Sequence, residues 1–332
     1  VRFSLTQYIS TQTLELLRLI AKFAGDNSAQ MYLVGGVVRD IVRDASAEDL
    51  DIDLVFECDA IKFAELLLNQ WEKVAPGYSK PKKITFPKYG TVKLLFAEGV
   101  LDNLREIDLA TARSETYETG GAAPKVRYAN LDQDLSRRDF SANAMAIAVD
   151  PAREGMLIDP FQGGIDIELK QLRILHPASF YEDPARLLRA VRLLVRLDFK
   201  LESRTKELFE QAVKSNYLSL LPAKRCFEEF LKVLSEQHVS DCLLKLYECS
   251  LLAQLIPDSS WIDSTFNSLS SAKLDFYLRG LNSRKQKLFL FAALLKNSQL
   301  LEITKIFTRF EVTAAEQVSI CDFIQQLNHG LR

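Results

Sequence analysis

Apolar residues recur with two different periods in the first third of the chain. Residues 11–24 and 61–71 place apolar side chains at the spacing of an amphipathic helix. Strands are expected at four short apolar runs, which occupy residues 31–34, 52–56, 91–96 and 106–110. A basic, glycine-containing segment follows residue 71 and is predicted as a loop. We therefore expect a sheet packed against helices in this part of the chain.

The pattern changes after the turn predicted at residues 159–164, and everything beyond it is predicted as helix. One helix is expected to begin at Pro184, which suits a first helical position, with Asp183 as its cap. Its buried stripe is predicted to hold Leu187, Val191, Leu194 and Val195. A second, basic stripe on this helix consists of Arg186, Arg189, Arg192 and Arg196. Taken alone, the second stripe is equally typical of a solvated helix face.

Two carboxylates stand at the start of the predicted strand that ends at Phe56. Alternate side chains of a strand share a face, so Asp51 and Asp53 would lie about 6.6 Å apart. Carboxylates this close repel each other unless a cation lies between them, and oxygen ligands suit Mg²⁺. A lone Asp-x-Asp is also typical of two surface aspartates on an edge strand.

A diglycine lies just upstream of these carboxylates. Gly35 and Gly36 follow an apolar run and precede a predicted helix, where glycine lets the backbone approach a ligand and the helix N-terminus favours an anion. An anion site beside a metal-binding carboxylate pair indicates nucleoside triphosphate chemistry. No Gly-Lys-Ser/Thr follows and a third glycine is missing, which argues against a Walker loop and a Rossmann fingerprint.

Three motifs occur in the order found in one enzyme family. They are Gly-Gly-Val-Val-Arg-Asp with Asp-Ile-Asp-Leu-Val at 35–55, Asp-Leu-Ser-Arg-Arg-Asp-Phe-Ser-Ala-Asn-Ala-Met at 134–145, and Glu-Asp-Pro-Ala-Arg at 182–186. The chain resembles the class II tRNA nucleotidyltransferases, a family of CCA-adding enzymes and bacterial poly(A) polymerases. The resemblance is dense from residue 31 to 234 and thin after it.

The resemblance implies an α+β fold with an N-terminal, polymerase-β-like nucleotidyltransferase head. A small mixed β-sheet flanked by helices would form this head, followed by an all-helical neck, body and tail. We expect the catalytic head at residues 1–148, a neck for nucleotide selection at 149–235, and a tRNA-binding body and tail at 236–332. The core of the last part is expected to include Trp261, Phe266 and Phe276.

The resemblance also assigns roles to single residues. Asp51 and Asp53 would bind Mg²⁺ as catalytic carboxylates, with Asp108 on a neighbouring strand as a candidate third carboxylate. Paired arginines suit a triphosphate because guanidinium groups give bidentate bonds to phosphate. Asp139 and Asn143, one helical turn apart, would reach the ribose and a phosphate. The expected nucleotide-binding residues are Gly35, Gly36, Arg39, Arg138, Asp139, Asn143, Asp183, Arg186 and Arg189.

The resemblance implies that the third motif selects the incoming nucleotide, and its residue types suit that role. Cytosine and adenine each present an amine donor beside a ring-nitrogen acceptor, which a carboxylate and a guanidinium match. Asp183 and Arg186 could therefore accept CTP and ATP and reject UTP and GTP, whose opposite polarity leaves buried groups unpaired at roughly 1–3 kcal/mol each. Support or phosphate contacts are expected from Arg189 and Arg192. Further along, Arg225 and Glu229 have the spacing of a helix-surface ion pair.

The predicted activity is template-independent addition of C, A or both to the 3′ end of tRNA. Residues 118–127, centred on Gly-Gly-Ala-Ala-Pro, are predicted to be irregular and mobile. In CCA-adding members a flexible loop in this place is tied to the final A addition, and here it is short and poor in charge. CC-only and A-only addition therefore stay open, as does a poly(A) polymerase. So do an RNA-binding protein with an inactive head and a small-molecule nucleotidyltransferase.

The composition of the chain argues against several classes of protein but does not indicate a function. The chain has 332 residues, of which 48% are hydrophobic and 26% charged, and a net charge of −2. Residues 170–206 nevertheless hold nine Lys or Arg against four Asp or Glu, a local basic surface that could bind phosphates. The five cysteines lack Cys-x-x-Cys spacing, so neither a disulfide framework nor a zinc site is expected. With no apolar run near ~20 residues and no signal peptide, we expect a soluble, cytoplasmic protein without a membrane span.

Overall fold

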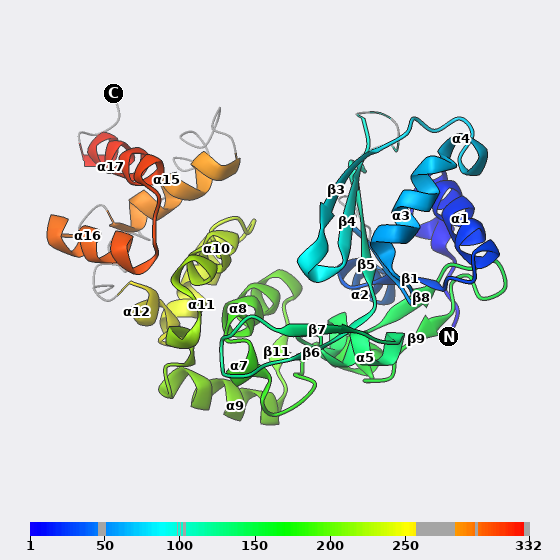
Figure 1. Ribbon diagram of the computed structural model, residues 1–332. Coiled ribbons are helices and arrows are strands. Elements are labelled where there is room, and N and C mark those ends of the chain that lie inside the picture. Colours follow the sequence, from blue (N-terminus) through cyan, green and yellow to red (C-terminus); the bar gives the residue numbers. More distant parts are fainter. Residues whose placement is uncertain are drawn as a thin grey trace. The chain divides into compact units, whose positions relative to one another are not determined.

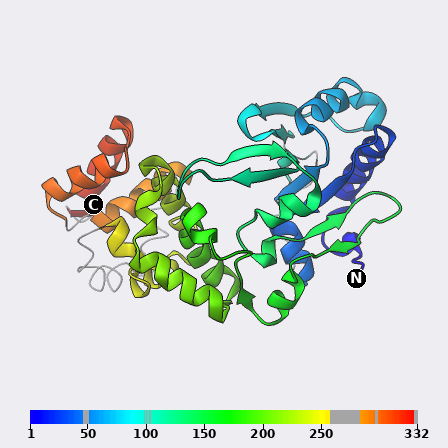
Figure 2. The same cartoon turned by 60° about the horizontal axis from the view of Figure 1, so that its bottom comes forward.

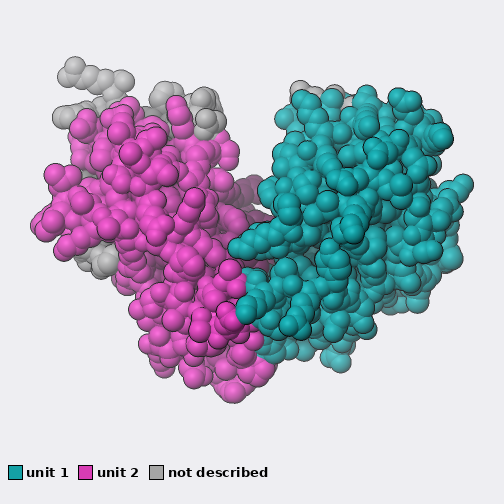
Figure 3. Space-filling view, viewed as in Figure 1, with its two compact units in different colours: residues 1–116, 124–176 teal, residues 117–123, 177–332 magenta. Residues whose placement is uncertain are grey.

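The computed structural model describes residues 1–45, 51–97, 99, 101, 104–256, 283–295 and 298–328. The chain divides into two compact units, teal and magenta in Figure 3. Unit 1 comprises residues 1–116 and 124–176, and unit 2 comprises residues 117–123 and those from 177 onward. The predicted core residues Trp261, Phe266 and Phe276 lie outside the described residues.

A mixed sheet forms the centre of unit 1 (Figure 1). In the described part of the chain its seven strands are ordered β3-β4-β5-β2-β1-β8-β9. β2 and β5 pair in parallel, whereas the other neighbours are antiparallel. The strands are β1 (Met31–Val34), β2 (Ile52–Phe56), β3 (Lys82–Phe86), β4 (Thr91–Leu95), β5 (Glu106–Thr111), β8 (Ala146–Ala148) and β9 (Leu157–Ile158). The predicted α+β class with a mixed sheet in the head is confirmed.

Helices cover one face of this sheet. α3 (Ala60–Asn69) packs on β4 and β5 and also contacts α1 (Thr11–Asp26), as Figure 1 shows. Its apolar stripe of Phe63, Ala64 and Leu67 is buried. The Asp59 side chain starts the helix by accepting hydrogen bonds from the backbone N–H groups of Ile61 and Lys62. Both helices predicted from apolar spacing are therefore present, although α3 ends at Asn69 and the short α4 (Trp71–Val74) follows.

The remaining helices of unit 1 are short, and all except η1 lie next to a strand along the chain. They are η1 (Leu5–Gln7), α2 (Gly36–Val42), η2 (Pro87–Tyr89), α5 (Leu131–Ser136), η3 (Ser141–Asn143) and α6 (Gly163–Glu168), where η marks a 3-10 helix. The capping box of Asn130 and Gln133 fixes the start of α5, because each side chain hydrogen-bonds the backbone N–H of the other residue.

Two segments predicted as loops contain strands. β3 lies in the basic segment after residue 71, where its exposed positions hide the alternation that marks a half-buried strand. The stretch 118–127 was expected to be irregular, yet its last residues belong to β7 (Lys125–Tyr128), which pairs with β6 (Arg113–Thr116). That prediction is wrong for residues 125–127. Pairing with the neighbouring strand β6 orders these residues, and their own sequence does not show a strand pattern.

The glycines of that stretch do have a conformational role. Residues 117–123 belong to unit 2, where the Gly121 backbone N–H donates to the carbonyl of Glu182 at 3.2 Å. Gly121 has a φ of +73°, and a Cβ at this position would lie 2.2 Å from the Leu220 carbonyl oxygen. Only glycine fits the backbone here.

The described residues of unit 2 form helices and the short strand β11 (Lys200–Leu201), and helices fill this unit in Figure 2. The helices are α7 (Ser179–Glu182), α8 (Ala185–Leu197), α9 (Ser203–Lys214), η4 (Tyr217–Leu220), α10 (Ala223–Val233), α11 (Val239–Glu248), α12 (Leu251–Leu255), α15 (Ser283–Leu295), α16 (Leu300–Arg309) and α17 (Ala314–Asn328). In unit 1, β10 (Gln171–Leu172) also follows the turn at 159–164, so the prediction of helix alone beyond it is wrong at two places. Within the described residues, no helix is long and apolar enough to cross a membrane.

α8 buries a broader surface than predicted because it packs against α7, α10 and α11. Leu187 and Val191 are buried as expected, and so are Leu188 and Leu193. The predicted core positions Leu194 and Val195 are only half-buried. Contacts with several helices widen the buried face beyond a single stripe.

Candidate active site

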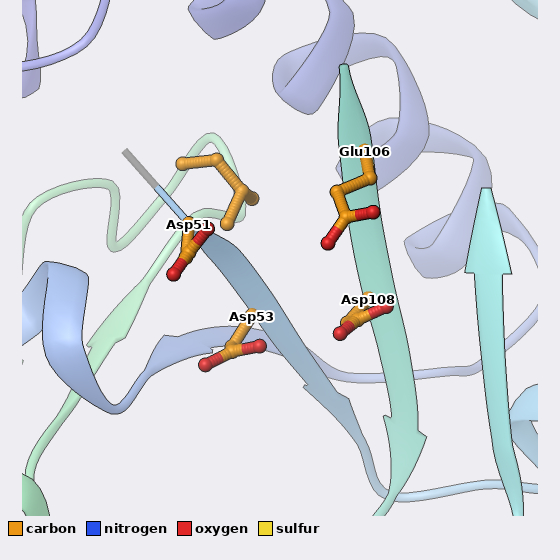
Figure 4. A pocket seen from close by; sticks show the side chains of 5 residues that line it. Asp51, Asp53, Glu106 and Asp108 are labelled. Atoms are coloured by element: carbon orange, nitrogen blue, oxygen red, sulfur yellow. The ribbon is translucent and has the colours of Figure 1, made fainter. Parts of the chain in front are cut away.

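Two neighbouring strands of unit 1 bring the predicted carboxylates together. β2 and β5 run parallel, and their register places Asp53 opposite Asp108. Asp51 directly precedes β2, two residues from Asp53, so both side chains lie on one face. Asp51, Asp53 and Asp108 line a single pocket, seen from close by in Figure 4.

The same pocket contains a carboxylate that the sequence analysis missed. Glu106 lines it from β5, two residues before Asp108 and on the same face. Lys93 of β4 lies beside this pair, with its Nζ atom 2.5 Å from Glu106 Oε1 and 3.5 Å from Asp108 Oδ2. The alternation of Glu106 and Asp108 along the strand could have revealed Glu106. The position of Lys93 depends on strand pairing and could not be read from the sequence.

Burial and mutual repulsion shape the electrostatics of this pocket. Burial and, to a smaller extent, the charge of Asp108 raise the pKa of Asp53 to about 6, against the opposing charge of Arg138. Burial also raises the pKa of Asp108, against the opposing charge of Lys93. Asp108 Oδ1 is buried and has no hydrogen-bond partner. The folded chain therefore holds carboxylates that its own side chains only partly neutralise.

These residues fit a divalent cation whose remaining coordination positions are filled by a bound ligand and water. Among the described residues, no group of three or more Asp, Glu, His or Cys side chains is gathered closely enough to hold a metal ion. Mg²⁺ is commonly held by only one or two carboxylates, with phosphate oxygens and water filling its octahedron. The carboxylates of Asp51 and Asp53, which line one pocket with Asp108 and its unpartnered Oδ1, match that chemistry.

The diglycine turn lies against the carboxylates. Gly35 precedes α2 with a φ of +77°, and a Cβ added there would lie 3.1 Å from Asp53 Oδ2 and 3.6 Å from Arg138 Nη1. The turn therefore packs closely against one acidic and one basic side chain. Gly36 begins α2, and a Cβ there would lie 3.7 Å from Arg39 Nη2. The structure thus collects Gly35, Gly36, Arg39, Asp53 and Arg138 in one region.

The two adjacent arginines of the second motif have different surroundings. Arg137 donates to Asp134, to Glu115 and to the backbone carbonyl of Arg113. Arg138 donates to Asp134 Oδ2 at 2.9 Å, whereas its buried Nε has no hydrogen-bond partner. Arg137 is thus held within the protein, and Arg138 lies beside Gly35 with hydrogen-bonding capacity left.

Arg39, Asn143 and Asp139 form a chain of hydrogen bonds. Arg39 Nη1 donates to Asn143 Oδ1 at 3.0 Å, and Asn143 Nδ2 donates to Asp139 Oδ1 at 3.0 Å. Asp139 and Arg39 are both buried. Residues 141–143 form a 3-10 helix, so Asp139 and Asn143 are not related by the expected turn of α-helix. Their side chains still meet, and they link the second motif to α2.

The third motif lies in unit 2, where its carboxylate is held by several donors. Asp183 Oδ1 accepts a hydrogen bond from Arg225 Nη2 at 2.9 Å and one from the backbone N–H of Ala185 at 3.2 Å. α8 begins at Ala185 and Pro184 is its N-cap residue, so the predicted start at Pro184 with Asp183 as the cap is wrong by one residue. The Asp183 carboxylate still accepts a bond from the first helical N–H. Arg186 is buried, donates to Ser179 Oγ at 2.5 Å, and has its Nε 4.0 Å from Asp183 Oδ2.

The partners of Arg225 and Glu229 differ from the prediction. Arg225 pairs with Asp183 rather than with Glu229. Glu229 is buried, pairs with Lys232 at 2.7 Å, and lies 3.9 Å from Arg189 Nη2. The predicted surface pair is wrong. α10 packs on α8, so Arg225 reaches Asp183 just before α8, whereas Glu229 pairs with Lys232 of its own helix and lies near Arg189 of α8. Arg225 and Ser179 are site neighbours that the sequence analysis missed.

Two further arginines of the basic stripe share one carboxylate. Arg192 Nε donates to Glu236 Oε1 at 2.7 Å, and Arg196 donates to both oxygens of the same group. Glu236 therefore links α8 to the segment that follows α10. Both arginines are thus paired with a carboxylate of their own unit.

Comparisons with known proteins match both units. Residues 31–173 match the model of the poly A polymerase head domain, and residues 198–262 match that of a probable RNA and SrmB-binding site of polymerase A. The chain is 40% identical over 239 residues to the A-adding tRNA nucleotidyltransferase of Aquifex aeolicus, an alignment that covers 72% of this chain and 27% of that protein. For the A-adding tRNA nucleotidyltransferase of Geobacter sulfurreducens the identity is 32%, covering 81% of this chain and 29% of the relative. The chain thus spans under a third of the length of these two relatives.

The fold also matches a solved structure. A CCA-adding enzyme in an apo form superposes with a TM-score of 0.80 at 29% identity, covering 98% of this chain and 74% of that one. The similarity therefore extends over both units of the chain.

Proposed function

The chain belongs to the family of class II tRNA nucleotidyltransferases and poly(A) polymerases, and we propose that it adds C, A or both to the 3′ end of tRNA without a template. CTP and ATP would be the substrates, and pyrophosphate the second product. The two relatives with the A-adding name support terminal A addition as the first reaction to test.

The observation that carries this proposal is the in-register pair of Asp53 and Asp108 beside Gly35 and Arg138. In the reaction, the RNA 3′-oxygen bonds to the α-phosphorus of the nucleotide, the bond to the pyrophosphate breaks, and the hydroxyl proton leaves. Arg138, with an unpartnered Nε, would bind the triphosphate. The unpartnered Oδ1 of Asp108 would accept the hydroxyl proton or its hydrogen bond.

Mg²⁺ fits the carboxylates of Asp51 and Asp53, and when bound there it would supply a Lewis acid for the attacking and leaving oxygens. The side chains themselves would orient the substrates. Arg39, Asn143 and Asp139 form one hydrogen-bonded chain and would act together, Asn143 toward a phosphate and Asp139 toward the ribose.

Base selection would belong to Asp183 and Arg186 in unit 2. Both are buried, and Arg225 and Ser179 fix their positions. Buried and held groups discriminate well, because a base of the wrong polarity leaves them unpaired at about 1–3 kcal/mol each. Arg189, beside Glu229, would support this arrangement.

The test is extension of three tRNA transcripts that end before CCA, after CC and after CCA, each with single nucleotides and with a mixture of CTP and ATP. Addition of one A to the CC-ended transcript only would identify an A-adding enzyme, and a stop after complete CCA would identify a CCA-adding one. Long A tails would assign the poly(A) polymerase activity instead. Absence of incorporation with intact tRNA binding would refute the proposal and favour an RNA-binding protein with an inactive head.

A further inference from the structure

The edge strand β3 carries an unusual surface. It is the first strand in the sheet order, so only β4 pairs with it among the described strands. Residues 80–90 contain Lys80, Lys82, Lys83 and Lys88 and no acidic residue, in a chain whose net charge is −2. Strands at a sheet edge often carry lysine to prevent aggregation. Lysine alone therefore does not indicate a ligand site. The side chains beside these lysines show whether this surface suits a ligand.

Strand register places part of this strand on the face that carries the catalytic carboxylates. Asp53 is opposite Asp108, Asp108 is opposite Lys93, and Lys93 is opposite Ile84. Paired residues project to the same face of a sheet. The ion pair between Lys93 and Asp108 agrees with this assignment. Ile84 and its alternate neighbours therefore extend the carboxylate face to the edge of the sheet.

The intervening residues point to the other face. Lys83 pairs at 2.9 Å with Glu65 of α3, the helix that covers the opposite side of the sheet. The strand thus separates its charges. One lysine is bound to the helix layer, whereas Lys82, Ile84 and Phe86 lie on the carboxylate face.

Large apolar side chains on this face are exposed. Ile84 is 43% exposed, Phe86 45% and the nearby Tyr89 38%. Lys88 Nζ lies 5.4 Å from the centre of the Tyr89 ring. In the part of the chain that the structure describes, Lys82 and Lys88 form no ion pair within 4.0 Å. Exposed rings with unneutralised lysines beside them are typical of surfaces that stack bases and contact phosphates of single-stranded nucleic acid.

We propose that Lys82, Ile84, Phe86, Lys88 and Tyr89, the β3 surface, bind the single-stranded nucleotides just upstream of the RNA 3′ end. Bases would stack on Phe86 and Tyr89, and the lysines would contact the backbone. Strands lie about 4.8 Å apart, so Ile84 is about 10 Å from Asp108 across β4. That distance equals about three stacked nucleotides at 3.4 Å each. This inference rests on the proposed function, because it requires an RNA end at the carboxylates.

The test compares Phe86→Ala with Phe86→Trp in the full chain. The KM for a CC-ended tRNA transcript should rise about tenfold in Phe86→Ala, since a base–aromatic stack commonly contributes about 1–3 kcal/mol. Phe86→Trp should keep the KM within about twofold, because it retains a stacking ring. The KM for ATP should be unchanged in both variants. Ile165→Ala is the matched control, because Ile165 is an exposed apolar residue of unit 1 on α6, at 53% exposure.

Direct binding separates this inference from the proposed function. A fluorescent single-stranded RNA ending in CC should bind Phe86→Ala about tenfold more weakly than wild type by anisotropy. Lys82→Ala should reduce the slope of log affinity against log salt by about 0.7, as expected for one lost phosphate contact. If wild type extends tRNA but the Phe86 and Lys82 variants match it in both assays, the inference is wrong. If wild type extends no transcript, the proposed function fails, and the binding assay still decides for or against the surface.

Discussion

The catalytic and base-selecting carboxylates of the two candidate sites are hydrogen-bonded to different degrees. In unit 1, Asp108 Oδ1 is buried without a hydrogen-bond partner, and burial beside Asp108 raises the pKa of Asp53 to about 6. In unit 2, Asp183 is held by Arg225 and by a backbone N–H. The first site has unmet charge that a ligand would satisfy. The second presents fixed hydrogen-bonding groups, which suits an uncharged base more than a triphosphate.

The difference separates catalysis from selection. A carboxylate pair that repels itself lowers the stability of the folded chain and raises affinity for cations. Paired groups keep the folded chain stable and hold donors and acceptors in fixed positions. Substitutions in the first site should therefore change activity with little loss of stability, whereas those in the second should change which nucleotide is used.

The largest effect is expected from removing the carboxylates of unit 1. Asp51→Ala combined with Asp53→Ala should lower incorporation by at least about a thousandfold, the scale at which charge stabilisation acts in such sites. Its melting temperature in chelator should not fall below that of wild type, because the substitutions relieve repulsion. Activity assays and thermal unfolding measure both. Retained incorporation would refute the site, and a collapsed melting temperature would mean that the carboxylates have a structural role.

A smaller effect is expected at the fully paired carboxylate of unit 1. Asp134 is completely buried and accepts hydrogen bonds from Arg137 at 2.6 Å and Arg138 at 2.9 Å. Burial alone would raise the pKa of this carboxyl, but the two arginines lower it below its usual range. Asp134→Asn should therefore lower the free energy of unfolding by about 3 kcal/mol near pH 7, as for one partner lost from a buried ion pair.

The same substitution has a defined pH dependence. A carboxyl with a lowered pKa in the folded state stabilises the protein above its unfolded pKa of about 3.9. That stabilisation is lost as pH falls through the lower, folded value. The difference between wild type and Asp134→Asn, measured by urea unfolding, should be constant from pH 7 to about 5 and shrink below about pH 4. A difference that grows at low pH would contradict the pairing.

The smallest of these effects is expected at Arg225, which positions Asp183. Arg225→Ala should lower kcat/KM for the preferred nucleotide about tenfold and reduce its preference over UTP and GTP, because one charge-assisted bond that orients the carboxylate is lost. Arg225→Lys should recover part of the preference. Lys232→Ala is the control, since it removes a cation from the same helix that pairs with Glu229 instead. Unchanged base preference in Arg225→Ala would assign Arg225 a purely structural role.

The sequence predicted the parts of the site that depend on local pattern. Period-two alternation placed Asp51 and Asp53 on one strand face, and the apolar spacing of residues 11–24 and 61–71 predicted the helices that cover the sheet. Asp108 is a polar position between Ile107 and Leu109 of a predicted strand, and the family resemblance made it the candidate third carboxylate. These features need no knowledge of distant contacts.

Features that depend on distant contacts could not be predicted. β3 is exposed along its length, and β7 acquires order only by pairing with β6, so neither shows the burial pattern of a strand. Arg225 was expected to pair with Glu229 by the i, i+4 rule, but its partner Asp183 is 42 residues away. Local rules favour nearby partners, and the packing of α8 against α10 overrides them.

The most direct test of the account is single-nucleotide addition to a CC-ended tRNA transcript by wild type, Asp53→Asn and Asp183→Ala, with each of the four nucleoside triphosphates. The account predicts that wild type uses ATP or CTP and rejects UTP and GTP, that Asp53→Asn incorporates none of them, and that Asp183→Ala retains slow incorporation with its preference lost. Efficient incorporation by Asp53→Asn, or an Asp183→Ala variant with the base preference of wild type, would contradict the division between catalysis in unit 1 and selection in unit 2.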